Sequence, residues 1–427
     1  MMKKSLPILK TKSREESSMY DVYKIRKQFP MLNGKKMQGK NLVYLDNAST
    51  TFKPQCVIDA MNEYYENATA NAHRGDYDLL NNMDNKVLEA REAVARFVNS
   101  DVNEVVFTAG DTMSLNLVAQ AYGRKFVNEG DEIILSEAEH ASNLLPWYQV
   151  AHEKKAIVKF IPLDKDGRLT VENLKKVFSS KTKVVSVAQM SNVLGNIVDI
   201  KEFAKVVHQN NAVLVVDGAQ SAPHLKSDFK GNDIDFLTIS GHKMCGPTGI
   251  GCLIGKYELL QSMDLYYVGG GMNETFNKQL EIYPYDAPRK FEAGTQNLAG
   301  IMGLKVAIDF LESIGLDEIR AHDRELCEYA ISKLEKCEDV IIYNKNAKNG
   351  VITFNKKGVF AQDEATLLNS KGIAVRSGQH CAKILNDFLG TPATCRASTY
   401  LYTTKEDIDA FVDAVINGGD FLDAYFN

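Results

Sequence analysis

The feature that most constrains the fold is an alternation of short apolar runs and helical patterns along the chain. Several apolar runs have the length and composition of buried strands, at residues 105–108, 132–135, 157–161, 184–188, 212–216 and 236–239. Segments with helical spacing lie among them, at residues 115–122, 174–178 and 200–209. Strands and helices alternate in this way in parallel α/β sheets, which bind ligands at the carboxyl ends of their strands. The sequence therefore predicts an α/β fold with its site at that edge of the sheet.

Polar side chains directly follow the predicted strands. Each of them alone has an ordinary structural explanation, such as a helix cap or a satisfied buried polar group. Their shared position after different strands indicates that they converge on one pocket. These residues are Thr112, His140, Asn192, Asp217, Gln220, His242 and Lys243.

A lysine stands in the glycine-rich turn 240–249, directly after the apolar run 236–239. Lysines are normally solvated on the surface, so Lys243 at the end of a buried strand is unusual. A lysine between a hydroxyl, an imidazole and glycines suits a Schiff base beside a phosphate. The alternative is an exposed lysine in a Gly/Pro turn.

A carboxylate, Asp217, ends the run 212–216 and needs a cationic or N–H partner if it is buried. A protonated pyridine nitrogen is such a partner, and an aspartate opposite it recurs in pyridoxal phosphate sites. Asp217 and Lys243 stand 26 residues apart, with one predicted strand between them. The alternative for Asp217 is a helix cap or a structural ion pair.

The turn 109–114 joins the strand 105–108 to a helix and carries Asp111, Thr112 and Ser114. Free N–H groups and the helix dipole at such a helix start favour a bound anion. The alternative is an ordinary N-cap by one of these three side chains.

The loop 376–382 places Cys381 after a predicted strand, flanked by His380 and near Arg376. Positively charged neighbours favour the thiolate, which is the nucleophilic form of cysteine. The alternative is a buried, inert loop cysteine.

Two further residues have both a functional and a structural interpretation. Arg396 can pair bidentately with a substrate carboxylate, or it can form an ordinary surface ion pair. His140 can lie on a cofactor ring, transfer protons or be structural. No pair of histidines has the spacing of metal ligands, so the sequence predicts no metal site.

Composition narrows the class of protein. The net charge of −5 leaves no basic surface for nucleic acid, and no apolar run approaches the ~20 residues that span a bilayer. Seven cysteines without CxxC spacing argue against a disulfide framework and for a reducing, cytoplasmic location. Residues 1–18 are polar and mixed in charge, without the apolar core of a secretory signal, so we expect a disordered extension.

The length of 427 residues favours two domains. We expect an N-terminal segment, 19–45, to pack with the smaller domain. We expect a large cofactor-binding domain at 46–315 and a small C-terminal domain with the cysteine loop at 316–427. Residues 263–292 are rich in tyrosine and glycine, and we expect them to form an excursion that reaches a neighbouring subunit.

Several short stretches carry a family resemblance, at residues 44–48, 72–75, 191–195, 216–220, 240–243, 246–249, 289–295 and 395–398. Together they resemble the cysteine desulfurases of the SufS/NifS type, within the class V aminotransferase-like enzymes. The likeness runs from about residue 20 to the C-terminus. The Arg-Ser-Gly-x-His-Cys-Ala loop is similar to the SufS-like branch, in which this loop is short and ordered.

The resemblance implies a fold-type I enzyme that binds pyridoxal 5′-phosphate. Its fold is expected to be a mostly parallel, seven-stranded sheet with helices on both faces, plus a smaller α+β C-terminal domain. The substrate is expected to be L-cysteine, with L-selenocysteine as an alternative. The active site is expected to lie at a homodimer interface.

The resemblance also assigns roles to single residues. Lys243 is expected to carry the cofactor covalently and to remove the α-proton of the substrate. Asp217 is expected to keep the pyridine nitrogen protonated, while Gln220 contacts the ring hydroxyl and His140 stacks on the ring. The expected phosphate ligands are Thr112, Ser240, His242 and, from the other subunit, Thr295. The expected substrate-binding residues are Asn192, Arg376, Arg396, His73 and Arg74.

The implied reaction converts L-cysteine to L-alanine and leaves a persulfide on Cys381. The persulfide is then passed to a sulfur-acceptor protein of an iron–sulfur cluster assembly system. Relatives of this fold also perform selenocysteine lysis, transamination or β-elimination. A non-catalytic scaffold for sulfur assembly is a further alternative.

Several positions depart from the usual pattern of the family. Asp111 and Met113 stand where Thr and Glu are usual, and Asp111 is expected to turn away from the phosphate and cap the helix. Gln379 stands where a histidine often precedes the cysteine loop. Gln362 lies where some relatives that pass sulfur to a zinc-containing partner have a histidine, which leaves the acceptor open.

Overall fold

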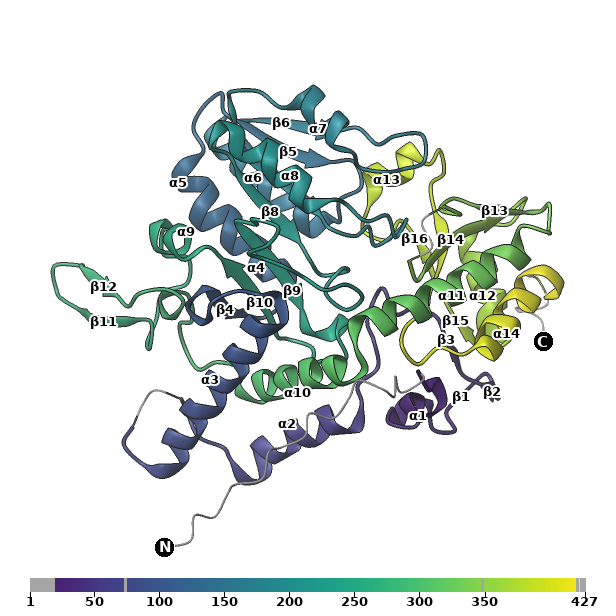
Figure 1. Ribbon diagram of the computed structural model, residues 1–427, viewed down its shortest axis with the longest axis horizontal. Helices are drawn as coiled ribbons and strands as arrows, with labels where there is room; N and C mark the ends of the chain where they lie inside the picture. Colours follow the sequence, from purple (N-terminus) through teal and green to yellow (C-terminus); the bar gives the residue numbers. More distant parts are fainter. Residues whose placement is uncertain (1–19, 73–74, 347–348, 420–421, 423–427) are drawn as a thin grey trace, which may run out of the picture.

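The computed structural model describes residues 20–72, 75–346, 349–419 and 422. The predicted extension 1–18 and the predicted substrate-binding residues His73 and Arg74 lie outside the described residues. Figure 1 shows a large α/β body with a second, smaller unit beside it. The long helices α10 (Leu298–Ile314) and α11 (Leu316–Leu334) connect the two.

The large sheet has the strand order β4-β10-β9-β8-β7-β5-β6. β10 is antiparallel to β4 and to β9, and every other pair of neighbours is parallel. The predicted mostly parallel, seven-stranded sheet is therefore confirmed. Its strands are β4 (Val105–Thr108), β5 (Glu132–Ser136), β6 (Ile157–Ile161), β7 (Thr182–Ala188), β8 (Val213–Asp217), β9 (Phe236–Ser240) and β10 (Gly251–Gly255).

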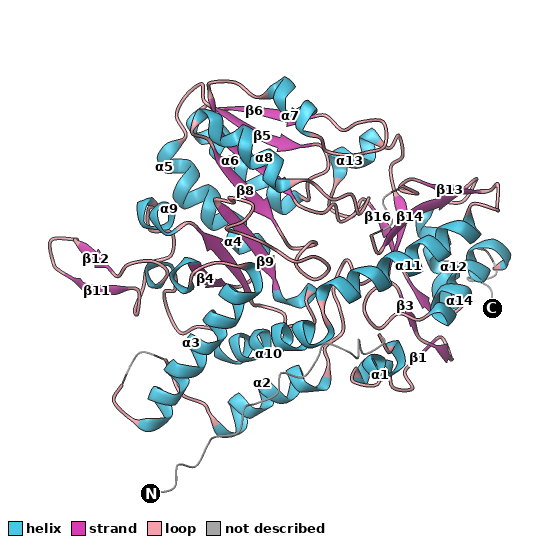
Figure 2. Ribbon diagram, viewed as in Figure 1, coloured by secondary structure: helices cyan, strands magenta, loops and turns pink. Residues whose placement is uncertain are grey.

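Alternate residues of these strands enter two separate hydrophobic cores, one on each face of the sheet. On β4, Val105 and Phe107 join one core and Val106 joins the other, as the two-residue period of a strand requires. Helices cover both faces, as predicted (Figure 2). They are α2 (Gln55–Asn67), α3 (Asp78–Val98), α4 (Asp111–Leu117), α5 (Arg124–Phe126), α6 (Leu145–Lys154), α7 (Val171–Val177), α8 (Ile200–Val207), α9 (Tyr257–Ser262) and α10.

The smaller unit is an antiparallel sheet with the order β13-β14-β17-β16 and its own hydrophobic core. Phe354 of this sheet packs edge-to-face on Phe411 of α14, with ring centroids 5.5 Å apart. The predicted α+β character is confirmed. The elements are β13 (Val340–Ile342), β14 (Val351–Lys356), α12 (Ala361–Ser370), β16 (Arg376–Gly378), α13 (Lys383–Phe388), β17 (Thr394–Ser398) and α14 (Lys405–Asn417).

The N-terminal segment packs against this smaller unit. β3 (Val43–Tyr44) pairs in parallel with β15 (Ile373–Ala374). Arg26 forms an ion pair with Asp407 of α14 at 2.7 Å. The remaining elements of the segment are α1 (Val22–Arg26), β1 (Lys36–Met37) and β2 (Lys40–Asn41).

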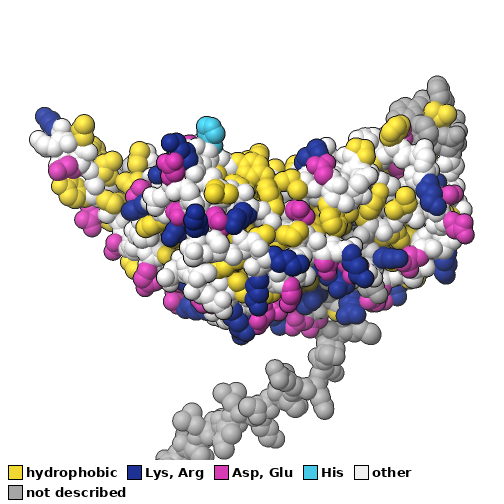
Figure 3. Space-filling model, turned by 90° about the horizontal axis from the view of Figure 1, so that it is seen from above, with side chains coloured by type: hydrophobic (Ala, Val, Ile, Leu, Met, Phe, Trp, Pro, Cys, Tyr) yellow, Lys and Arg dark blue, Asp and Glu magenta, His cyan; other side chains and the backbone are white. Residues whose placement is uncertain are grey.

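A hairpin of β11 (Asn273–Phe276) and β12 (Ile282–Pro284) projects from the large body, at the left edge of Figure 1. Leu280, between the two strands, is 91% exposed. Seen from above in Figure 3, hydrophobic side chains gather along a hollowed edge of the molecule. Among the described residues, no helix combines the length and apolar content of a membrane span.

Candidate active site

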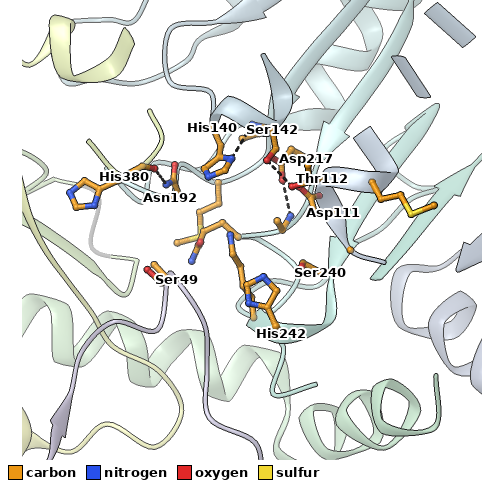
Figure 4. Close-up of a pocket in the computed structure, with 18 of the residues that line it drawn as sticks. Ser49, Asp111, Thr112, His140, Ser142, Asn192, Asp217, Ser240, His242 and His380 are labelled. Atoms are coloured by element: carbon orange, nitrogen blue, oxygen red, sulfur yellow. Dashed lines mark hydrogen bonds between the residues drawn. The ribbon is translucent and has the colours of Figure 1, made fainter. Parts of the chain in front are cut away.

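A cavity of about 650 Å³ lies at the carboxyl ends of the sheet strands, between the large body and the smaller unit. It brings together most of the residues that the sequence predicted for a site (Figure 4). Those that line it are Thr112, His140, Asn192, Asp217, Gln220, Ser240, His242, Lys243, Arg376 and Arg396. The prediction that polar residues after different strands converge is confirmed.

Lys243 ends a short 3-10 turn that follows β9 and faces the cavity. Among the described residues it has no hydrogen bond or ion pair. Burial lowers the pKa of its amine, against the opposing charges of Asp217 and Asp111. A lysine held this way loses its proton more readily than a solvated turn lysine, which favours its nucleophilic and basic form.

Asp217 is the last residue of β8, and its carboxylate is buried at the cavity wall. Its Oδ1 accepts a hydrogen bond from the N–H of Ala219 at 2.9 Å. It caps no helix and forms no ion pair within the described part of the chain, so neither structural alternative holds. A buried carboxylate that faces a cavity is suited to a cationic ligand atom, such as a protonated ring nitrogen.

His140 caps the start of a short 3-10 turn, and its imidazole lines the cavity. Its Nδ1 accepts a hydrogen bond from the N–H of Ser142 at 3.1 Å, which places the proton of a neutral ring on Nε2. Burial and then the charge of Lys243 lower the pKa of His140. Beneath it, Glu139 accepts hydrogen bonds from Asn143 and from the main chain of β7, which anchors this loop to the sheet.

Hydroxyl groups gather where α4 begins and β9 ends. Thr112 Oγ1 and Ser142 Oγ lie 2.8 Å apart. Ser240 lies near Gly110, whose φ of +141° favours glycine over any residue with a side chain. Burial lowers the pKa of His242 to about 4, so its imidazole is neutral. Neutral donors around a helix start are suited to an anion such as phosphate.

The prediction that Asp111 caps α4 is wrong. Gly110 occupies the cap position, and no side chain caps this helix. The Oδ1 of Asp111 instead accepts a hydrogen bond from Thr238 of β9 at 2.5 Å, and the residue lines the cavity. The cause is the packing of the first turn of α4 over β9, which brings the carboxyl within reach of a buried hydroxyl.

Two arginines of the smaller unit reach the opposite side of the cavity. Arg396 on β17 is 1% exposed, so its ion pair with Asp46 at 3.2 Å is not an ordinary surface pair. It donates to the carbonyl of Asn192 at 2.9 Å, and its Nε is buried without a partner. Arg376 on β16 lies beside it. An unpartnered guanidinium N–H in a cavity is suited to a carboxylate ligand.

Ser49 joins these two arginines, and the sequence did not predict it. Its Oγ accepts hydrogen bonds from Arg376 at 2.9 Å and from Arg396 at 2.8 Å. The one feature of the sequence that could have pointed to Ser49 is its position directly after the motif stretch 44–48. Sequence spacing does not reveal that two arginines more than three hundred residues away meet this hydroxyl.

Cys381 lies next to the cavity and is exposed, so it is not a buried, inert cysteine. Its φ of +58° is in the left-handed region, which is strained for a residue with a side chain. Arg376 Nη2 approaches its Sγ at 3.8 Å. Its carbonyl accepts a hydrogen bond from the N–H of Ala141 at 2.8 Å, which joins the cysteine loop to the loop of His140.

His380 does not assist the thiol, contrary to the expectation from its position in the sequence. Its Nε2 contacts the backbone carbonyl and hydroxyl of Thr394 at 3.0 Å, and its ring points away from the cavity (Figure 4). Burial and the charge of Arg396 lower its pKa to about 3, so it carries no positive charge. The left-handed turn at 380–381 sends the two neighbouring side chains in different directions.

Thr295 is exposed before α10 and does not line the cavity. Its expected role from another subunit stays a prediction. Met113 lines the cavity, whereas Gln362 is exposed in the first turn of α12.

The donor set fits the expected cofactor. The amine of Lys243 is unpartnered within the described residues, and Asp217 presents a buried carboxylate. The Oε1 of Gln220 is buried without a hydrogen-bond partner, so it has a free acceptor for a ligand hydroxyl. Thr112 and Ser240 supply neutral donors for an anion.

Comparison with known proteins agrees with this site. The family model for class-V aminotransferases matches residues 43–411. A probable cysteine desulfurase of Halalkalibacterium halodurans is 46% identical over 391 residues, which cover 91% of this chain and 96% of the relative. A probable cysteine desulfurase of Staphylococcus aureus is 44% identical over 410 residues, which cover 95% and 99%.

Solved structures give the same result. The cysteine desulfurase CsdA of Escherichia coli matches with a TM-score of 0.87 at 37% identity, over 93% of this chain and 98% of that one. The apo cysteine desulfurase of Thermococcus onnurineus matches with a TM-score of 0.88 at 35% identity and the same coverage. The chain therefore belongs to the class-V aminotransferase family and, within it, to the cysteine desulfurases.

Proposed function

We propose that this desulfurase takes the sulfur of L-cysteine onto Cys381 as a persulfide and releases L-alanine, which supplies sulfur for iron–sulfur cluster assembly. The observation that carries the proposal is the placement of the thiol. Cys381 is exposed beside a cavity that contains an unpartnered amine, and a main-chain hydrogen bond fixes its loop to the cavity wall.

The cofactor is pyridoxal 5′-phosphate. When bound, it withdraws electrons from the α-carbon of a substrate whose amino group is joined to it. Lys243 would hold it covalently, Asp217 would pair with the ring nitrogen and Gln220 would accept from the ring hydroxyl. His140 would stack on the ring. Neutral donors from Thr112, Ser240 and His242 would bind the phosphate.

Lys243 removes the α-proton of the substrate. Burial lowers the pKa of this lysine, so a larger fraction of it is the neutral base than for a solvated lysine at the same pH. Arg396 binds the substrate carboxylate with its guanidinium, which Asn192 supports through the hydrogen bond that its carbonyl accepts. These contacts hold the substrate with its sulfur toward the mouth of the cavity.

Sulfur transfer follows at the mouth. The thiolate of Cys381 attacks the substrate sulfur and forms an S–S bond, while the carbon–sulfur bond breaks. The electron pair of that bond stays with carbon, which takes up a proton and becomes the methyl group of alanine. A proton also returns to the α-carbon in place of the one that Lys243 removed. The guanidinium of Arg376 contacts Sγ of Cys381 at 3.8 Å and lies next to the attacking sulfur.

The test uses two exposed cysteines, Cys381 and Cys56. Cys381→Ser is expected to lower alanine formation from L-cysteine at least ~100-fold without added thiol, because serine is a poor nucleophile toward sulfur. Cys56→Ser is the matched control and is expected to keep wild-type activity. Mass spectrometry of the wild type after substrate addition is expected to show one extra sulfur atom on Cys381.

Other outcomes contradict the proposal. Equal activity of Cys381→Ser would remove the thiol from the reaction. Pyruvate as the product would indicate β-elimination, and activity only with L-selenocysteine would indicate a selenocysteine lyase.

The assembly and location of the protein complete the proposal. A homodimer is supported by the exposed hairpin and by Thr295, which lies outside the cavity of its own chain. Transfer to a sulfur-acceptor protein is supported by the exposure of Cys381. The cysteines of the described residues are all free, which supports a cytoplasmic location.

A further inference from the structure

Asp111 is a carboxyl group in the cavity that the proposed reaction does not use. It is the first residue of α4 and is 8% exposed. Its Oδ1 accepts a hydrogen bond from Thr238 at 2.5 Å. Within the described residues its Oδ2 has no partner, and that oxygen is not among the fully enclosed polar atoms. Because Asp111 lines the cavity, Oδ2 is available to a bound ligand.

A second carboxyl group lies close to the first. Thr238 of β9 is the register partner of Asp217 of β8, so the two side chains share one face of the sheet. Thr238 therefore lies beside Asp217 while it donates to Asp111. Two carboxyl groups held together in a buried site disfavour double ionisation, so one of the two keeps a proton.

The charged groups around Asp111 come from two elements. Asp217 ends β8, and Lys243 belongs to the turn after β9. Burial, and then the charge of Asp217, raise the pKa of Asp111 to about 8, against the hydrogen bond from Thr238 and the charge of Lys243. Asp111 is therefore protonated at neutral pH, and a protonated carboxyl has one O–H to donate.

The neighbours of Asp111 are the hydroxyls that suit an anion. Thr112 is the next residue, and Ser240 lies two residues beyond Thr238 on β9. An ionised carboxylate at this position would repel a phosphate, whereas a protonated one can donate to it. We propose that Asp111 donates a hydrogen bond, as a neutral carboxylic acid, to the phosphate of the bound cofactor. This inference rests on the phosphate position in the proposed function.

The consequence is a cofactor affinity that falls as pH rises. Above its pKa in the empty cavity, Asp111 ionises and its charge opposes the phosphate. Burial also lowers the pKa of Lys243, so the wild type alone does not isolate the effect of Asp111. Asp111→Asn keeps the shape and a hydrogen-bond donor but does not titrate. The ratio of the dissociation constants of wild type and Asp111→Asn therefore measures the effect of Asp111 ionisation on cofactor binding.

The experiment titrates apoprotein with pyridoxal 5′-phosphate and follows the visible absorbance of the bound cofactor. Near pH 6.5 the dissociation constants of the wild type and Asp111→Asn are expected to agree within ~3-fold. Above about pH 8 the ratio of wild type to variant is expected to rise about tenfold per pH unit. With pyridoxal, which lacks the phosphate, the ratio is expected to stay flat.

Three results would overturn the proposal. They are a flat ratio with pyridoxal 5′-phosphate, an equal rise with pyridoxal, and binding by Asp111→Asn that is ~10-fold tighter near pH 6.5.

A second variant, Thr238→Val, leaves Asp111 in place and serves if Asp111→Asn does not fold. The hydrogen bond from Thr238 stabilises the ionised carboxylate, so its loss is expected to move the fall in affinity to higher pH. An unchanged midpoint would contradict the role of Asp111. None of these measurements requires turnover, so they stay informative if the desulfurase reaction itself is disproved.

Discussion

Burial shifts the pKa values of several single residues in the cavity toward their less charged forms. Burial lowers the pKa values of Lys243, His140 and His242, and it raises that of Asp111 to about 8. Each shift has desolvation as its largest cause. Beside Arg376 and Arg396, the cavity therefore presents groups whose charged forms are destabilised by burial.

The pH dependence of α-proton removal follows from Lys243. Its folded-state pKa is below the ordinary lysine value, so the neutral base is populated at lower pH than for a solvated lysine, and the rate falls as pH drops through the shifted pKa. We expect exchange of the α-proton of L-alanine in deuterated buffer, measured by NMR in Cys381→Ser, to rise with pH. Lys243→Ala is expected to lower the exchange at least ~100-fold. Exchange that is independent of pH and of Lys243 would assign the base elsewhere.

The sequence predicts the cavity residues that follow apolar runs. Lys243 and Asp217 are of this kind, because a strand end dictates where the next side chains lie. The orientation of His380 and the contacts of Ser49 were not predictable in this way. They depend on a left-handed turn and on packing between distant segments, which no local pattern encodes.

At the scale of elements, β10 shows that hydrophobic patterns in the sequence do not reveal every strand. The sequence patterns predicted no strand at residues 251–255, yet β10 is a buried strand between β4 and β9. The single strand predicted before the cysteine loop is in fact two strands, β15 and β16, in different sheets. Tertiary pairing determines both, whereas β4 and β6 match the predicted runs 105–108 and 157–161.

Gly251 is required by close packing of β10 on its neighbours. A Cβ there would lie 2.5 Å from the carbonyl oxygen of Ile239 and 2.7 Å from the Cα of Gly110. Gly251→Ala is expected to destabilise the fold by about 1–3 kcal/mol and lower the melting temperature by about 2–6 °C. Gly269→Ala, whose Cβ would make an ordinary 3.7 Å contact, is the control and should melt like the wild type. If Gly251→Ala had the same melting temperature as the Gly269→Ala control, β10 would be able to move away from its neighbours without loss of stability.

At the scale of the whole molecule, the projecting hairpin carries apolar side chains that no other part of the described chain covers. Phe276 is 74% exposed and Leu280 is 91% exposed, on a segment that packs on little of its own chain. Exposed apolar side chains of this kind mark a surface for another protein. In the proposed homodimer, the second copy covers them.

The double variant Phe276→Glu and Leu280→Glu tests this assembly. Light scattering is expected to give twice the 47.5 kDa chain mass for the wild type and a single chain mass for the variant, because charges oppose burial. Phe360→Glu, at a 76% exposed site on the smaller unit, is the control and should leave the mass unchanged. A variant that keeps the wild-type mass would place the interface elsewhere.

The hydrogen bond from the N–H of Ala141 to the carbonyl of Cys381 has a consequence for mutagenesis. Both atoms belong to the main chain, so almost any pair of side chains at these positions preserves the link. Only proline at position 141 removes the donor. The cysteine loop can therefore diversify its side chains during evolution or engineering without losing its attachment. An alanine scan of the two loops would miss the contact that joins them.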